Sequence, residues 1–89
     1  MNAILVEDRD NVAVATEPIA VGDVIRFVTH AHGEREVAAV EDIQIYHKVA
    51  VVDIPAGGDV VKYGECIGRA SKNISVGMHV HTHNVENLS

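Results

Sequence analysis

The sequence has little of three things on which small proteins often depend: cysteine, aromatic side chains and clustered positive charge. Its single cysteine, Cys66, cannot form an internal disulfide, and we expect it to be a small core residue. The aromatic residues are only Phe27, Tyr46 and Tyr63, so the core is thin. Lys and Arg number 7 against 13 Asp and Glu, giving a formal net charge of −6. This balance argues against binding to nucleic acid or to an anionic membrane surface.

Long apolar runs are absent as well. No stretch approaches the roughly 18 consecutive apolar residues of a membrane-spanning helix, and the N-terminus lacks the basic-then-apolar profile of a signal peptide. Together with the lone cysteine, these absences predict a cytoplasmic protein in a reducing compartment, with no membrane partner.

Branched aliphatic side chains dominate what is present, with sixteen Val and eight Ile against two Leu. Such side chains lose rotamer freedom in a helix and pack well on a pleated sheet. The 89 residues therefore predict one all-β domain over residues 1–89, with short strands and at most a helical turn near residues 62–65. The thin core leaves open whether a partner chain or a homo-oligomer covers part of the surface.

One short pattern, Ile-x-[Val/Ala]-Gly-x-x-[Val/Ile], occurs three times, at residues 19–25, 54–60 and 74–80. It is typical of a tight turn in which the glycine supplies an uncrowded or positive-φ position between two apolar segments. The unequal spacing indicates a reused corner and not a solenoid. The third copy leads directly into the most unusual part of the chain.

Half of the six histidines lie in that part, at positions 79, 81 and 83. In an extended strand they share one face, with neighbouring imidazoles roughly 6.6 Å apart and the outer pair about 13 Å apart. Metal–nitrogen bonds of about 2.1 Å then allow at most two of the three to share one ion on a straight strand. The third histidine then lies next to the metal ligands without binding the ion, carries a proton, or contacts a partner. The alternative is a solvated polar edge strand.

A second pair, His30 and His32, lies in a glycine-containing turn. Nothing on either side gives it a strand context, so we expect both side chains to be solvated loop residues.

Three segments, in this order and near this spacing, carry a resemblance to a known family. They are His47-Lys48-Val49-Ala50, then Val61-Lys62-Tyr63-Gly64 with Ile67-Gly68, and then Gly77 with His79-Val80-His81-Thr82-His83-Asn84. The chain resembles, from about Asp10 to Asn84, the SAF-type β-clip domain of altronate dehydratase-like enzymes. Galactarate dehydratase is a more distant member of that group, and the small subunit of sulfolactate sulfo-lyase is a close one. Residues 29–40 match least.

The resemblance implies a lyase that removes water, or sulfite in the sister enzyme, from a small sugar-acid substrate. It also implies a divalent metal cofactor, usually ferrous iron, and a large catalytic subunit that contains most of the active site. Because the chain ends five residues after Asn84, we expect the small subunit of a two-chain enzyme, inactive alone, although a trimmed piece would look the same. The choice among altronate, galactarate and sulfolactate stays open.

β-Elimination needs a base for the α proton, an acid for the leaving group and a cation beside the developing enediolate. We expect the metal ligands to be His79, His81 and His83. The candidate catalytic residues are His81, His83, His47, Lys48 and Lys62. Lys48 and Asn84 are the candidate substrate-binding residues, with Asn84 also an orienting hydrogen-bond partner. For both lysines the alternative is an exposed charge at a strand end, and for the whole chain it is a non-catalytic module that binds a sugar acid, a metal or a partner.

Overall fold

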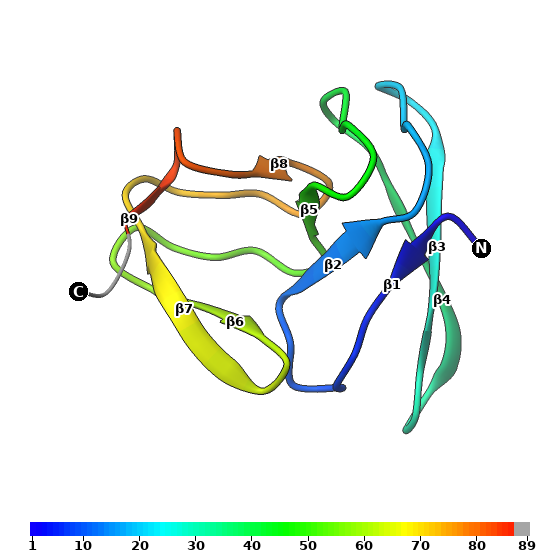
Figure 1. The fold of residues 1–89 in the computed structure, drawn as a ribbon, viewed down its shortest axis with the longest axis horizontal. Coiled ribbons are helices and arrows are strands. Elements are labelled where there is room, and N and C mark those ends of the chain that lie inside the picture. Colours follow the sequence, from blue (N-terminus) through cyan, green and yellow to red (C-terminus); the bar gives the residue numbers. More distant parts are fainter. Residues whose placement is uncertain (87–89) are drawn as a thin grey trace.

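The computed structural model describes residues 1–86 and contains nine short strands, paired antiparallel in three small sheets (Figure 1). The central sheet has the order β1 (Ala3–Ile4), β2 (Val12–Ala15), β5 (Lys48–Ala50) and β8 (His79–Val80). On one side of it lies the hairpin of β3 (Val24–Thr29) and β4 (Gly33–Ala38). On the other lies the hairpin of β6 (Asp59–Lys62) and β7 (Glu65–Ala70), extended by β9 (Val85–Glu86).

The described residues form no helix, which confirms the all-β prediction, and the turn at 63–64 is a hairpin turn instead of a helical one. It follows that none of these residues belongs to a helix that could cross a membrane.

Four corners, not three, connect these strands. In each predicted corner the glycine has positive φ, 90° at Gly22, 82° at Gly57 and 88° at Gly77, and its N–H donates to an alanine carbonyl at 2.8 Å. The same geometry occurs at residues 43–49, where Tyr46 has φ 69° and donates to the Ala15 carbonyl at 2.7 Å. A search for glycine overlooks this fourth corner because a tyrosine occupies the left-handed position.

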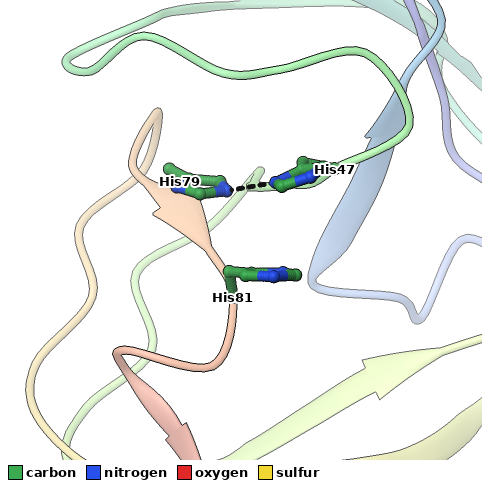
Figure 2. Close-up of side chains that lie close together, drawn as sticks. All are labelled: His47, His79 and His81. Atoms are coloured by element: carbon green, nitrogen blue, oxygen red, sulfur yellow. Dashed lines mark hydrogen bonds between the residues drawn. The ribbon is translucent and has the colours of Figure 1, made fainter.

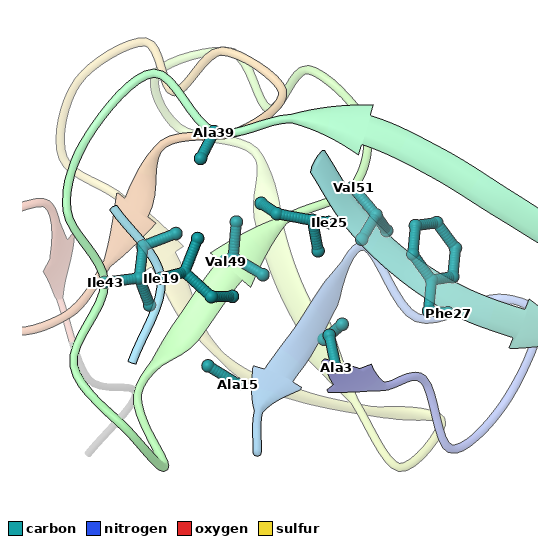
Figure 3. Close-up of a cluster of buried hydrophobic side chains, with 10 residues drawn as sticks. Ala3, Ala15, Ile19, Ile25, Phe27, Ala39, Ile43, Val49 and Val51 are labelled. Atoms are coloured by element: carbon teal, nitrogen blue, oxygen red, sulfur yellow. The ribbon is translucent and has the colours of Figure 1, made fainter. Parts of the chain in front are cut away.

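The corners associate in pairs and divide the molecule into two halves. Ile19 and Ile43 exchange two backbone hydrogen bonds of 2.9 and 2.8 Å, and Ile54 and Ile74 exchange two of 2.8 Å. Each pair of isoleucines is buried in its own apolar cluster, and Figure 3 shows the first of the two.

Strand β5 lies between the two clusters. Val49 belongs to the first cluster and Ala50 to the second, and both are fully buried. Since successive residues of a strand point to opposite faces, the centre of the main sheet is covered on both sides. Burying each valine or isoleucine contributes roughly 1.5–3 kcal/mol, which explains why a chain with three aromatic residues can form a core.

Cys66 is exposed, so the prediction that it belongs to the core is wrong. The cause is a register shift between Val60 and Val61, which places Cys66 opposite Val61 near the hairpin turn. The thiol faces away from the core and donates to the Gly68 carbonyl at 3.3 Å.

His30 and His32 are exposed in the turn between β3 and β4, as expected of solvated loop residues. The backbone N–H groups of His30 and Ala31 donate to the two carboxylate oxygens of Asp8 at 2.7 and 2.6 Å. That contact fixes the turn through its backbone and leaves both imidazoles in solvent.

Candidate metal centre

Two corners bring histidines together from distant parts of the chain. The corner at 43–49 places His47 immediately before β5, and the corner at 74–80 places His79 at the start of β8. Strands β5 and β8 pair antiparallel with Val49 opposite His79. His47 therefore lies beside the 79–83 segment although 32 residues separate it from His79.

The resulting group, which we call the histidine cluster, consists of His47, His79 and His81 (Figure 2). Each ring offers one nitrogen, and these atoms all lie within 4.8 Å of one another. The ring centroids are 5.0 Å apart for His47 and His79, 4.4 Å for His47 and His81, and 5.5 Å for His79 and His81. The planes of the three rings are inclined to one another by only 13° to 23°, so the rings are stacked.

The closest contact in the cluster joins His47 Nδ1 to His79 Nε2 at 2.8 Å. Two nitrogens that ligate one ion at about 2.1 Å are separated by about 3.0 Å at a 90° angle and about 3.4 Å at a tetrahedral angle. The observed separation is about 0.2 Å shorter than the first of these. The pair therefore fits one ion after a small movement of either ring, and imidazole suits zinc, copper, nickel and iron alike.

His83 is not a member of the cluster. Strand β8 ends at Val80 and a turn follows over residues 81–84, so the extended row assumed for the three histidines does not form. The exposed His83 ring lies against the His79 ring, tilted by 35° with a centroid distance of 5.1 Å. Of the predicted row, the structure brings together His79 and His81, and His47 supplies the third nitrogen.

Asn84 explains why the strand ends there. Its side chain is buried, accepts the His81 backbone N–H at 2.9 Å and donates to the His79 carbonyl at 2.8 Å. These two bonds fix the backbone on both sides of Val80 and with it the spacing of two cluster histidines. The geometry agrees with an orienting residue, and the amide has no exposed face for direct contact with a substrate.

The cluster favours neutral imidazoles. Partial burial lowers the pKa of His79, and the neighbouring His47, His83 and His81 lower it further, while the Glu41 carboxylate opposes them. The pKa of His81 is lowered by desolvation and then by His47, Lys48 and His83. Neutral imidazole is the form that ligates metal, so the surroundings keep two cluster members ready to bind one.

A small cleft continues from the cluster toward the second half of the molecule. It has a volume of about 100 Å³ and is lined by Lys48, Ile67, His81, Thr82 and Val85. Burial lowers the pKa of Lys48, and the charge of Lys62 lowers it further. Lys62 itself lies over the Tyr63 ring, with Nζ 4.9 Å from the ring centroid.

Two features of the site were not evident from the sequence. His47 was expected to take part in catalysis, but its place among the possible ligands depends on the unrecognised fourth corner. Glu41, which precedes that corner, accepts the His79 backbone N–H through Oε1 at 3.0 Å, yet no local motif pointed to it. Both contacts join residues more than thirty positions apart, so only the folded structure reveals them.

Fold and site together define a small all-β domain whose corners assemble three imidazoles beside a basic cleft. The chain belongs to the altronate/galactarate dehydratase SAF domain family, whose model matches residues 1–88. The resemblance inferred from the three segments of sequence is thus confirmed.

Relatives of known name agree with this assignment. The chain is 39% identical over 87 residues to the altronate dehydratase of Bacillus subtilis, covering 97% of this chain and 16% of that protein. It is 39% identical over 90 residues to the altronate dehydratase of Escherichia coli, covering all of this chain and 17% of that protein. With the (2R)-sulfolactate sulfo-lyase subunit alpha of Paracoccus pantotrophus it shares 46% identity over 57 residues, covering 64% of this chain and 85% of the subunit. The chain thus spans about one sixth of the length of the two dehydratases.

Proposed function

We propose that this chain is the SAF component of a metal-dependent lyase that eliminates water from a sugar acid together with a large catalytic polypeptide. The observation that carries the proposal is the histidine cluster, in which three nitrogens lie within 4.8 Å of one another in a domain of the dehydratase family.

The cluster residues would hold a divalent ion, which we propose to be ferrous iron, and the ion would supply positive charge beside the substrate carboxylate. Stacking keeps the three rings together, and the Asn84 turn fixes the backbone of His79 and His81. Neutral rings at positions 79 and 81 leave their lone pairs available for the ion.

The groups around the cluster divide the remaining tasks. Lys48, in the cleft beside His81, binds the substrate carboxylate, and Lys62 adds a second positive charge nearby. His83 is exposed next to His79 and can protonate the leaving hydroxyl. The large polypeptide supplies the base that removes the α proton.

The size of the cleft supports a second polypeptide. Pockets for small molecules usually have volumes of about 300–1,000 Å³, whereas the cleft at His81 has about 100 Å³. A sugar acid bound here would leave most of its surface in solvent, where charges are strongly screened. A further domain or subunit that closes over the cluster would complete the pocket.

The test is reconstitution. The chain is combined with a candidate large polypeptide, and water elimination from altronate and galactarate is measured with ferrous iron added. We expect activity only in the combination, a loss by orders of magnitude for His81→Ala, and little loss for His32→Ala, which alters an exposed turn. Near-normal activity and metal content in an assembled His81→Ala enzyme, or turnover by the chain alone, would overturn the proposal.

One alternative has an observation of its own. The sulfolactate sulfo-lyase subunit alpha is a short protein, and the match covers 85% of it at 46% identity. Release of sulfite from sulfolactate by the reconstituted enzyme, without water elimination from sugar acids, would favour that activity. Binding of a sugar acid or metal without turnover in any combination would favour a non-catalytic module.

A further inference from the structure

Glu41 is an acidic residue placed against a group of histidines, and within residues 1–86 it forms no salt bridge. Its Oε1 accepts the His79 backbone N–H at 3.0 Å, and its charge acts on the His79 ring. The residue is half-buried. The salt bridges of residues 1–86 join Arg9 to Glu7 and Arg26 to Glu36, and Glu41 takes part in neither.

The hydrogen bond alone does not explain a carboxylate at this position. A glutamine would accept the same backbone N–H with its amide oxygen and would avoid the cost of partly burying a charge. The chain also carries a net charge of −6, so a further negative charge adds to the repulsion among its acidic groups. The Glu41 carboxylate has a compensating positive charge only when a cation is present at the histidine cluster.

A divalent ion in the cluster would be that charge. Three neutral imidazoles donate electron pairs but bring no negative charge, so the ion would keep its full positive charge in a partly desolvated place. Glu41 is not in the group of possible ligands, whose donor atoms lie within 4.8 Å of one another. It is fixed next to one ligand through that ligand's backbone.

We propose that Glu41 is the charge-compensating residue of the metal centre, stabilising a divalent cation at the histidine cluster from outside the set of ligands. The inference rests on the proposed function, since it presupposes that the cluster binds metal. It adds that metal affinity depends on the charge of Glu41 and not only on the hydrogen bond to His79. The natural ligand of the site is then a cation of charge two or more, not an anion or a neutral molecule.

Matched variants separate charge from hydrogen bond. Glu41→Gln keeps an acceptor for the His79 N–H and removes the charge, whereas Glu41→Ala removes both. Asp42→Asn is the control, because Asp42 Oδ1 accepts the Val21 backbone N–H at 2.8 Å at the neighbouring corner. It makes the same change in net charge, one residue away, at a corner with no histidine.

The full-length chain is titrated with Co²⁺, and binding is followed by visible absorption and calorimetry. We expect Glu41→Gln to weaken Co²⁺ binding about 10-fold or more, the size of effect typical of groups around a metal site. Asp42→Asn should stay within twofold of the unmodified chain, and Glu41→Ala should bind no more tightly than Glu41→Gln.

Co²⁺ affinity of Glu41→Gln equal to that of the unmodified chain would overturn the inference and leave Glu41 a purely structural acceptor. Equal losses in Glu41→Gln and Asp42→Asn would overturn it too, because net charge alone would then explain them. If the unmodified chain bound no Co²⁺, the metal centre of the proposed function would fail first, and this inference with it.

Discussion

His47→Ala and His83→Ala form the pair of substitutions that best tests how the metal site is built. The sequence pattern places the ligands in the row 79, 81 and 83, whereas the structure groups His47 with His79 and His81. Both substitutions remove one imidazole next to His79, the stacked His47 ring with a centroid distance of 5.0 Å and the tilted His83 ring with one of 5.1 Å. Only the His47 nitrogen is close enough to share an ion with the other two.

The expected magnitudes differ accordingly. Removing a group outside the set of ligands costs about 10–100-fold in metal affinity, so removing one of three ligands should cost more than about 100-fold, or about 2.8 kcal/mol. His83→Ala removes an exposed ring that is not in the cluster and should change the affinity less than about threefold. The difference between the two variants is the quantity of interest.

Competition between the protein and a chelator of known affinity measures this difference for Co²⁺ or Fe²⁺. Thermal unfolding without metal provides the control, because both metal-free variants should stay folded at the temperature of the titration. The reverse ranking, with His83→Ala weaker than His47→Ala, would refute the cluster and restore the row. Equal large losses would indicate that the 81–84 turn rearranges to add a fourth nitrogen.

Four further predictions concern the cluster and the residues that position it. Burial and neighbouring positive groups lower the pKa of His79 and His81. Co²⁺ affinity should therefore persist as the pH falls past the ordinary histidine value near 6.5 and decline only below it. A decline centred above pH 6.5 in a series of titrations would contradict this. The same pKa shifts make the metal-free protein less stable as the pH falls below about 6.5, since the unfolded chain then binds protons that the folded chain does not. Denaturant unfolding at several pH values measures this loss of stability. Tyr46→Gly should raise stability by about 1 kcal/mol, which is a rise in Tm of roughly 4–8 °C. A left-handed tyrosine costs roughly 1–2 kcal/mol, and the chain entropy of glycine offsets about 0.5–1 kcal/mol of the gain. As the control, Ile45→Gly, in the same corner but without positive φ, should lower the Tm. Asn84→Ala should destabilise the chain by about 1–3 kcal/mol and also weaken Co²⁺ binding, because it leaves the His81 N–H and the His79 carbonyl without their buried partner. A loss of stability with unchanged Co²⁺ affinity would show that the turn does not set the spacing of the histidines.

The fold could be predicted from local features of the sequence. The excess of Val and Ile favours strands wherever they lie, and three glycines mark corners because each supplies positive φ. Tyr46 shows the limit of this approach, since a corner formed by an unusual residue gives no local signal. Cys66 shows another limit, because a register shift in β6 decides its exposure.

The site could be predicted only in part, for a similar reason. The alternating histidines indicated that two of them could share an ion, and His79 and His81 do lie together. The third nitrogen, from His47, comes from 32 residues away through the pairing of β5 with β8. The carboxylate of Glu41 comes from 38 residues away, next to the backbone hydrogen bond from Val40 to Gly77. The Asn84 side chain ends the strand through hydrogen bonds to the backbone of His79 and His81. The alternation of histidines in the sequence gives no sign of this.

The distance along the chain between His47 and His79 has a consequence for folding. An ion held by both rings would act as a reversible crosslink that closes a loop of 32 residues. By the chain-entropy model used for disulfides, closing such a loop removes about 3–4 kcal/mol of conformational freedom from the unfolded chain. The polypeptide has one cysteine and cannot make such a bridge internally with sulfur. A metal ion bound between the two halves would crosslink them as a disulfide does. Unlike a disulfide, this crosslink would persist under reducing conditions and would be removed by a chelator.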